Sequence, residues 1–310
     1  MVSIAMATYN GERFLREQID SLYSQTVKPS EIIVVDDNSI DGTIEILEEY
    51  KKKYGLKYYR NKSNLGVNKT FEKALKLTTG DYVMFCDQDD IWFPNKIEVT
   101  LNKMKEIGGD LPAVVSSQCD DIDAQGNIIR KYKKNKENNS HIETTFIDLG
   151  NCQGSTMMLN RKLINLLKPF PEQMVMYDRY ISCLAAAIGI KYNLYEPLMY
   201  YRHHDRNVTT RITNYSNKNF KKRLNNLKKE SSSIIPKDRL MSLLYINKEY
   251  SELIKDEASK LIKELNAYSN KGLISKLIYL LKLKNINYRY KQRVAISDII
   301  SKLNIKNSNV

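Results

Sequence analysis

Three carboxylates stand within four residues, at Asp87, Asp89 and Asp90, directly after the apolar run of residues 82–86. Such a cluster repels itself unless a positive charge lies between its members. A hard divalent cation that carries a diphosphate would supply that charge, because Mg²⁺ or Mn²⁺ binds one or two carboxylates and completes its coordination with phosphate oxygens and water. The alternative is a solvated acidic turn before a helix that begins at Pro94.

The apolar run of residues 82–86 is typical of a short strand that is buried on both faces of a parallel sheet. The acidic residues would then lie at the carboxyl end of this strand, where open α/β sheets bind their ligands. Residues 31–37 predict a second strand that is rich in β-branched residues and ends in two acids. Residues 3–7 predict a third, followed by a turn at residues 8–11.

Helical periodicity separates these strands. Apolar residues recur at helical spacing in residues 14–23, 44–54 and 69–77, and residues 56–59 predict one more short strand. This alternation predicts an α/β protein with a doubly wound, mostly parallel sheet flanked by helices.

After Pro94 the alternation is less regular. The pattern first predicts a helix to about residue 107, a strand near residues 113–117 and a hairpin turn at residues 123–126. A polar loop at residues 131–141 and a strand at residues 154–159 follow. After Tyr177 and Asp178 the pattern predicts an apolar helix at residues 181–188 and two strands at residues 191–195 and 198–201. Beyond about residue 210 only helical periodicity remains.

The positive charge is concentrated in the last third of the chain. Residues 201–310 contain 24 of the 49 lysines and arginines and 9 of the 36 acidic residues, a local balance of +15 within a net charge of +13. The preceding residues balance at −2. This division predicts a nearly neutral catalytic body followed by a cationic attachment surface.

The cysteines and the chain start favour a protein of the cytoplasm. The four cysteines, at positions 86, 119, 152 and 183, form no C-x-x-C pair, and only three histidines are present, which argues against a zinc site. The sequence begins with a strand-like segment, and no apolar stretch approaches about 18 residues. We therefore expect neither a signal peptide nor a membrane span.

Seven short motifs occur in an order that resembles the family 2 glycosyltransferases with the GT-A fold. They are Thr8-Tyr-Asn10, Val34-Val-Asp-Asp-Asn-Ser39, Asn64-Leu-Gly66, Asp87-Gln-Asp-Asp-Ile-Trp92, Gly154-Ser-Thr-Met-Met158, Tyr177-Asp178 and Tyr200-Tyr-Arg-His-His204. The fourth motif, with the preceding cysteine, is most similar to bacterial rhamnosyltransferases and related enzymes that build surface polysaccharide.

The resemblance implies a GT-A-type, Rossmann-like sheet within a catalytic domain at residues 1–210. The nucleotide-sugar half would cover about residues 1–110 and the acceptor half about residues 111–210. Residues 211–310 would form a basic, mostly helical C-terminal region.

The donor side would be built at the strand ends. Asp37 is placed to accept a hydrogen bond from N3–H of uracil or thymine, and the resemblance implies that it is the nucleobase aspartate; the alternative is a cap of the following helix. Lys69 would meet phosphate or remain a solvated helix lysine. The other donor-side candidates, which would bind a UDP- or dTDP-sugar, are Thr8, Tyr9, Asn10 and Asn64.

The metal side would centre on Asp89, with Asp87 as its partner toward the nucleotide. The expected cofactor is Mn²⁺ or Mg²⁺, which would neutralise the charge of the departing diphosphate. The resemblance adds His204 as a group that holds the metal or the diphosphate, and the adjacent His203 leaves that choice open.

Asp178 is the candidate general base, because inversion at an anomeric carbon needs one carboxylate to take the proton of the acceptor hydroxyl. The alternative is a helix N-cap, since Asp178 precedes an apolar helix. Gly154 belongs to the acceptor-side motif of the resemblance. Trp92 would line the acceptor side as a stacking surface for sugars or belong to the core.

These inferences predict an inverting, metal-dependent glycosyltransferase of the hexosyl type. It would move a sugar, with rhamnose as one candidate, from a nucleoside-diphosphate sugar to a growing bacterial surface glycan. One alternative is a nucleotidyltransferase acting on sugar phosphates, although residues 8–11 lack the glycine-rich phosphate loop usual in that class. The other is a nucleic-acid-binding protein, for which the basic third shows no recognition module; we expect no nucleic-acid partner.

The C-terminal region carries a broad apolar face flanked by lysines. Such a segment predicts a peripheral contact with the inner face of the cytoplasmic membrane, where a lipid-linked acceptor would be found. The alternative is packing on the catalytic body or on a second subunit of a homodimer. The apolar residues are Leu273, Ile274, Leu277, Ile278, Leu280 and Leu281, and the lysines are Lys271, Lys276, Lys282 and Lys284.

Overall fold

The computed structural model describes residues 1–133, 141–147, 153–171, 176–207, 235, 237–269, 271 and 273–283. Most of the polar loop predicted at residues 131–141 lies outside this set, as do Cys152 and Lys284.

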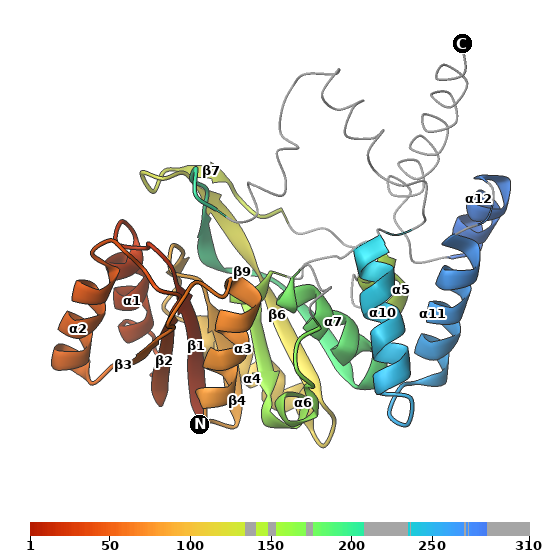
Figure 1. Ribbon diagram of the computed structural model, residues 1–310, viewed down its shortest axis with the longest axis horizontal. Helices are drawn as coiled ribbons and strands as arrows, with labels where there is room; N and C mark the ends of the chain where they lie inside the picture. Colours follow the sequence, from red (N-terminus) through yellow and green to blue (C-terminus); the bar gives the residue numbers. More distant parts are fainter. Residues whose placement is uncertain are drawn as a thin grey trace, which may run out of the picture.

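The described residues form one nine-stranded sheet with the order β3-β2-β1-β4-β8-β6-β9-β5, and β7 pairs with β6 at the side (Figure 1). The first four strands of this order run parallel, and β8 is antiparallel to both of its neighbours. β6 and β9 are parallel to each other, whereas β5 and β7 are antiparallel to their neighbours, so six of the nine strands share one direction. The strands are β1 (Val2–Thr8), β2 (Glu31–Asp36), β3 (Lys57–Arg60), β4 (Tyr82–Cys86), β5 (Ile91–Trp92), β6 (Ala113–Ile122), β7 (Ile128–Arg130), β8 (Met157–Asn160) and β9 (Ile190–Arg202).

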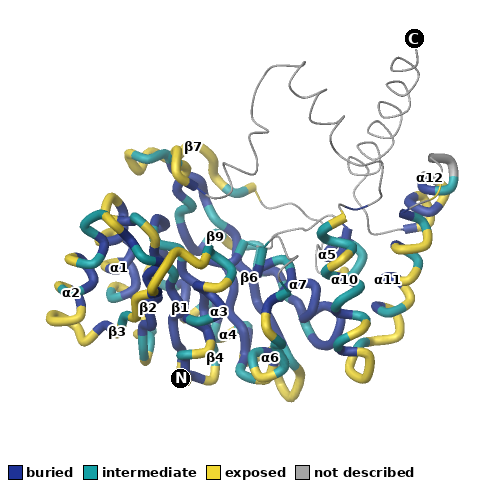
Figure 2. The backbone as a smooth tube through the Cα atoms, viewed as in Figure 1, coloured by how far each residue is buried: buried dark blue, intermediate teal, exposed yellow. Residues whose placement is uncertain are grey.

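Helices cover both faces of this sheet. Apolar side chains of α1 (Leu15–Tyr23), α2 (Thr43–Tyr54) and α4 (Lys96–Gly108) share one core cluster with the strands. The opposite cluster takes side chains from α3 (Val67–Leu77), α5 (Ile142–Ile147), α6 (Arg161–Leu166) and α7 (Tyr177–Ile188). Figure 2 shows the resulting dark central strands between partly exposed helices.

The two-sided burial explains why the strands are apolar without interruption. In β4, Val83 and Phe85 point into the α3–α7 cluster, while Met84 and Cys86 point into the α1–α2–α4 cluster. All four side chains are fully buried. A strand that alternates polar and apolar residues would place polar groups in one of the two cores, so a continuous apolar run is required.

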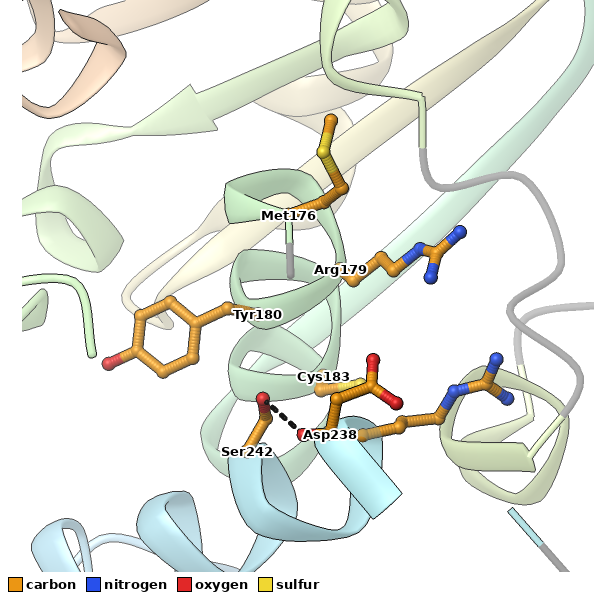
Figure 3. A pocket seen from close by; sticks show the side chains of 7 residues that line it. Met176, Arg179, Tyr180, Cys183, Asp238 and Ser242 are labelled. Carbon is orange, nitrogen blue, oxygen red and sulfur yellow. Dashed lines mark hydrogen bonds between the residues drawn. The ribbon is translucent and has the colours of Figure 1, made fainter. Parts of the chain in front are cut away.

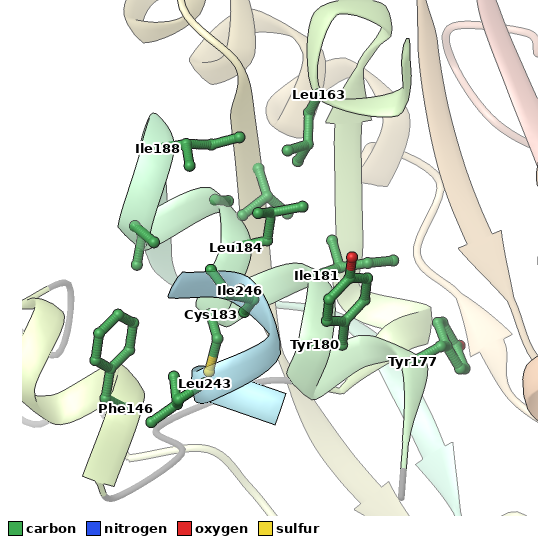
Figure 4. Packing of buried hydrophobic residues seen from close by; sticks show 14 of the residues in the cluster. Phe146, Leu163, Tyr177, Tyr180, Ile181, Cys183, Leu184, Ile188, Leu243 and Ile246 are labelled. Carbon is green, nitrogen blue, oxygen red and sulfur yellow. The ribbon is translucent and has the colours of Figure 1, made fainter. Parts of the chain in front are cut away.

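The C-terminal helices extend the α3–α7 cluster. The helices α10 (Lys237–Glu249) and α11 (Asp256–Ser269) contact α7, and α12 (Leu273–Lys282) contacts α11. Figure 4 shows Leu243 and Ile246 of α10 beside Cys183 and Leu184 of α7. This part of the C-terminal region therefore packs on the catalytic body.

A small pocket at the contact of α7 and α10 has a volume of only about 10 Å³ (Figure 3). It is lined by Met176, Arg179, Tyr180, Cys183, Asp238, Arg239 and Ser242. This volume is about that of a single water probe, so the pocket is a packing gap and not a ligand site.

The apolar face predicted at residues 273–281 is divided by the fold. Leu280 is fully buried, whereas Ile278 and Leu281 are exposed. The side chains of Leu273, Ile274 and Leu277 lie outside the described set. Across the described residues, no helix combines the length and the apolar character needed to cross a bilayer.

The mostly parallel α/β fold is confirmed, and three local predictions are wrong. Residues 154–156 form a 3₁₀ turn before β8 instead of the start of a strand. Helix α7 begins at Tyr177 and not at residue 181, which places Asp178 inside its first turn. The two strands predicted at residues 191–201 are one long strand, β9, that bends where its register with β6 shifts.

Candidate active site

The loops after β1 and β4 are joined by one side-chain amide. Gln88 accepts from Tyr9 N at 2.8 Å and donates to Tyr9 O at 3.0 Å. A Cβ atom on Gly11 would lie 2.3 Å from Gln88 Oε1, so only glycine leaves space for this clamp. Asn10 adopts a left-handed backbone at φ 50° and its carboxamide oxygen accepts from Ile40 N at 2.9 Å, which ties the loop after β1 to the loop after β2.

Asp37 holds the turn predicted at Asn64–Gly66. Its carboxylate accepts from Asn61 Nδ2, Leu65 N and Gly66 N, each at 2.8 Å. A carboxylate has about four lone-pair directions, so one remains for a further donor such as a nucleobase N–H. Asn64 itself is exposed.

Asp37 does not cap α2, whose N-cap residue is Gly42. Asp41 accepts from Thr43 N at 3.1 Å at the start of α2. Asp36 instead accepts from Thr8 Oγ1 at 3.1 Å and from Ser39 N at 2.9 Å, which fixes the ends of β1 and β2 against each other. Thr8 is thereby buried, while Tyr9 remains 45% exposed.

Asp89 and His204 form a close pair across the site. His204 Nε2 lies 2.8 Å from Asp89 Oδ2, and both side chains are nearly buried. His203 points elsewhere: it is 44% exposed and its Nε2 lies 3.5 Å from Asp121 Oδ1. Of the two adjacent histidines, it is His204 that the fold brings to the acidic motif.

The Asp89–His204 pair fits two neighbouring ligands of one divalent cation. Two atoms at about 2.1 Å from a metal and at right angles would be about 3 Å apart, close to the observed separation. Within the described part of the chain, no three His, Cys, Asp or Glu side chains come together as a metal site. A cation held here would therefore take its other ligands from phosphate oxygens and water, as Mg²⁺ and Mn²⁺ commonly do.

Asp87 and Asp178 are buried carboxyl groups whose pKa values are both raised. Burial, the Asp89 charge and the Asp178 charge together raise the pKa of Asp87 to about 7. Burial raises the pKa of Asp178 to about 6, against the effect of the neighbouring Arg179. Crowded carboxylates that resist ionisation are a physical reason for a cation to bind among them.

Gly154 brings its backbone N–H to the candidate base. This N–H donates to Asp178 Oδ2 at 3.2 Å. A Cβ atom at this position would lie 1.9 Å from the Tyr177 hydroxyl, so the close approach requires glycine. The start of α7 is also tied to the donor half, because Tyr177 N donates to Asn68 Oδ1 at 3.0 Å.

Two predicted site residues occupy less direct positions. Lys69 is 45% exposed at the side chain, and its Nζ lies 3.3 Å from Glu72 Oε2, on the wall of a cavity of about 320 Å³. Trp92 is only 2% exposed, and Lys96 Nζ lies 3.9 Å from its ring centroid. The ring is therefore part of the core in this structure, and its acceptor-side role stays a prediction.

The fold adds buried charged residues that were not among the predicted site residues. Lys96 is fully buried, with Nζ 2.6 Å from Ser155 O, and burial lowers its pKa to about 7. Asp90 is also fully buried, and burial raises its pKa well above the usual range. Arg202 donates to the Asp89 carbonyl at 2.9 Å. Asp90 and Arg202 carried a signal, since they stand within the Asp87–Trp92 and Tyr200–His204 motifs.

Comparison with known sequences gives one family. The model of the glycosyl transferase family 2 matches residues 3–167, more than half of the chain. The uncharacterized glycosyltransferase MJ1057 of Methanocaldococcus jannaschii is 32% identical over 191 residues, which cover 60% of this chain and 65% of that protein. The putative glycosyltransferase EpsE of Bacillus subtilis is 40% identical over 31% of this chain and 36% of its own.

The poly(ribitol-phosphate) beta-glucosyltransferase of Bacillus spizizenii is 36% identical over 35% of this chain and 20% of its own. The chain thus spans less than two thirds of the length of these three curated relatives.

Solved structures share the fold at low sequence identity. S. aureus TarS 1–349 in complex with UDP-GlcNAc superposes with a TM-score of 0.59 at 16% identity, covering 99% of this chain and 92% of that one. The mannosyltransferase PcManGT from Pyrobaculum calidifontis, in complex with GDP-Man and Mn²⁺, gives 0.53 at 14% identity, with 97% and 86% covered. The sheet is therefore of the GT-A type. The family match selects sugar transfer over nucleotidyl transfer and nucleic-acid binding, and the chain is a member of the family 2 glycosyltransferases.

Proposed function

We propose that this glycosyltransferase moves a hexosyl residue, with inversion, from a nucleoside-diphosphate sugar to a growing bacterial surface glycan. The observation that carries the proposal is the arrangement at the carboxyl ends of β4 and β9 and at the start of α7. There the Asp89–His204 pair and the separate carboxylate Asp178 both lie close enough to Asp87 or to the motif around it to form one site. A cation site beside an isolated base is what direct displacement at an anomeric carbon needs.

The donor nucleotide would bind in the first half of the sheet. Asp37 has one lone-pair direction left to accept N3–H of uracil or thymine, while Thr8, Tyr9 and Asn10 form the adjoining loop. Asn64 belongs to the turn that Asp37 holds and Lys69 follows it, and a phosphate would draw Lys69 away from Glu72. TarS binds UDP-GlcNAc and PcManGT binds GDP-Man, which supports a nucleotide-sugar donor here.

Asp89 and His204 would hold Mn²⁺ or Mg²⁺, with Asp87 facing the nucleotide. The ion supplies neutralisation of the charge that develops on the departing diphosphate. His204 Nδ1 accepts from Arg206 N at 3.2 Å, which leaves the imidazole proton on Nε2 toward Asp89. A cation at Nε2 would require the other neutral tautomer, with the proton on Nδ1 and the Arg206 contact broken.

Asp178 would take the proton of the acceptor hydroxyl. With a pKa of about 6 its carboxylate is mostly ionised at neutral pH, and the Gly154 N–H holds one oxygen in place. The acceptor oxygen forms its bond to the anomeric carbon while the bond to the diphosphate oxygen breaks. The proton passes to Asp178 and the electron pair leaves with the diphosphate, so no covalent enzyme intermediate forms.

The acceptor is proposed as a glycan or related polymer. One relative is named as a poly(ribitol-phosphate) glucosyltransferase, which supports a polymeric acceptor, and the form of the Asp87–Trp92 motif keeps rhamnose as a candidate sugar. A lipid-linked acceptor and a peripheral membrane contact belong to the same proposal. Exposed Ile278 and Leu281 on α12 are the described apolar residues available for that contact.

Sedimentation with vesicles tests the membrane contact separately. Anionic vesicles should retain the wild-type protein at low salt and release it as ionic strength rises, whereas neutral vesicles should not retain it. The double variant Ile278→Ser with Leu281→Ser should bind more weakly. Equal absence of wild-type protein from anionic and neutral vesicle pellets would contradict the contact and leave packing or dimerisation as the role of α12.

Donor binding is tested by thermal shift with a panel of UDP- and dTDP-sugars in Mn²⁺ or Mg²⁺. Ligands that bind the native state raise its melting temperature, because a hundredfold excess over Kd adds about 2.7 kcal/mol of stability. Asp37→Asn should reduce the shift. A wild-type protein that no nucleotide sugar stabilises would contradict the proposed donor.

A further inference from the structure

Arg202 is a buried arginine at the end of β9 whose contacts converge on the acidic motif. The residue is 2% exposed. Its Nε donates to the Asp89 carbonyl at 2.9 Å, and its backbone N donates to Asp90 Oδ1 at 3.2 Å. One terminal nitrogen of the guanidinium is ion-paired with Glu17 on α1. A single side chain thus connects the last strand, the acidic motif and the first helix.

Phe14 links the same guanidinium to the His204 ring. The Arg202 Cζ atom lies 4.8 Å from the Phe14 ring centroid, in cation–π geometry. His204 also packs on the Phe14 ring, and the two ring centroids are 4.9 Å apart. Arg202 therefore acts on both members of the Asp89–His204 pair, on one through a hydrogen bond and on the other through a shared aromatic neighbour.

The turn after Arg202 is closed by Asn207. Its Nδ2 donates to Arg202 O at 3.0 Å, and its Oδ1 accepts from His204 N at 2.5 Å. His203 N donates to Ile122 O at 2.8 Å, which fixes the other end of the turn to β6. The position of the His204 backbone therefore follows from where Arg202 is anchored.

We propose that Arg202 is a positioning residue that sets Asp89 and His204 at the spacing of two ligands of one cation. This inference rests on the metal site of the proposed function. Lysine cannot replace it, because an ammonium group has neither the planar fork that reaches Asp89 and Glu17 together nor the flat face that lies on Phe14. Groups that orient metal ligands commonly change metal affinity by about 10–100-fold when they are removed.

The test is Mn²⁺ titration followed by NMR of labelled histidine side chains. The chain has three histidines, so the spectrum is simple, and His204→Gln assigns the His204 signals by their loss. Paramagnetic Mn²⁺ broadens the signals of nearby nuclei. In the wild-type protein the His204 signals should broaden at lower Mn²⁺ concentrations than those of His203. In Arg202→Lys the concentration for half-broadening of His204 should rise about tenfold or more.

Arg161→Lys is the matched control. Arg161 is part-buried, and its guanidinium Nε donates to Gly80 O at 2.9 Å, before the amino end of β4 and away from the acidic motif. This variant loses a comparable planar contact and should keep the wild-type broadening curve. Melting temperatures of both variants show whether the fold is retained. If Arg202→Lys does not fold, Phe14→Leu replaces it, since it keeps an apolar side chain in the core and removes the ring between Arg202 and His204.

The outcomes separate this inference from the proposed function. A wild-type protein whose His204 signals are not broadened selectively would contradict the metal site, and Arg202 positioning with it. Selective broadening in the wild type that persists at the same Mn²⁺ concentration in a folded Arg202→Lys variant would contradict the role of Arg202 alone. If Arg202→Lys does not fold, an unchanged Mn²⁺ broadening curve of His204 in Phe14→Leu would contradict the role of Arg202.

Discussion

The raised pKa of Asp178 predicts how the rate of sugar transfer depends on pH. Burial moves this carboxyl from its ordinary pKa of 3.8 to about 6. The base works only when it is ionised, so the rate should rise with pH through about 6 and level off above it. The ionised fraction is ~0.9 at pH 7 and ~0.1 at pH 5, which predicts a roughly tenfold loss of rate over these two units.

An aspartate with an ordinary pKa would give a different profile. It would be about 90% ionised or more at pH 5, so the rate would hardly change between pH 5 and pH 7. The assay is release of nucleoside diphosphate at saturating metal and donor. These conditions matter because Asp87 also has a raised pKa, of about 7, and its titration would affect donor binding.

The variant Asp178→Asn identifies the group behind the profile. It should bind the donor normally and lose transfer by ~10²–10⁴-fold, because an amide of the same shape cannot take the proton. A wild-type rate that stays flat from pH 7 to pH 5, in a protein whose circular dichroism is unchanged, would refute the role of burial. Equal loss of donor affinity and transfer in Asp178→Asn would refute the assignment as base.

Three further variants test other parts of the site. Asp89→Ala should lower turnover by ~10²–10³-fold and remove metal-dependent donor binding without changing the melting temperature; near-normal turnover in metal would contradict a ligand role. Gly154→Ala should lose about 1–3 kcal/mol of stability, seen in urea unfolding, because its Cβ would meet the Tyr177 hydroxyl, and an unchanged midpoint would show that α7 can shift freely. Asp37→Asn should weaken UDP binding, measured by calorimetry, by about tenfold. Only one polar atom of an amide accepts hydrogen bonds, so the variant cannot accept from both Leu65 N and Gly66 N as the two carboxylate oxygens do. Wild-type affinity would place the nucleobase elsewhere.

The elements that the sequence predicted are those whose burial shows in their own residues, such as a strand that is covered on both faces. The strand at residues 82–86 was readable because both of its faces are covered, which forces a continuous apolar run. The start of α7 was predicted too late because Tyr177 and Asp178 look like a polar preface to the apolar helix. They are buried instead by contacts with Gly154 and with Asn68, which is more than a hundred positions away. Local periodicity does not contain such contacts.

The site residues show the same division. Asp87, Asp89 and Asp178 were chosen from their types and their motifs, and the fold brings them close enough that the charges of Asp89 and Asp178 raise the pKa of Asp87. The choice between His203 and His204 depended on how the chain turns after β9. Asn207 and Arg202 fix that turn, and both are distant from the acidic motif in the sequence. The burial of Trp92 follows from pairing of β5 with β9, which no local pattern indicates.

Product analysis tests the central claim most directly. The wild-type protein and Asp89→Ala are incubated with a panel of nucleotide sugars, Mn²⁺ or Mg²⁺ and a bacterial cell-envelope extract as the source of acceptors. The account predicts release of nucleoside diphosphate from at least one donor, with sugar transferred to the extract, only when metal is present and only by the wild type. Release of pyrophosphate, or transfer that is equally fast without metal and in Asp89→Ala, would contradict it.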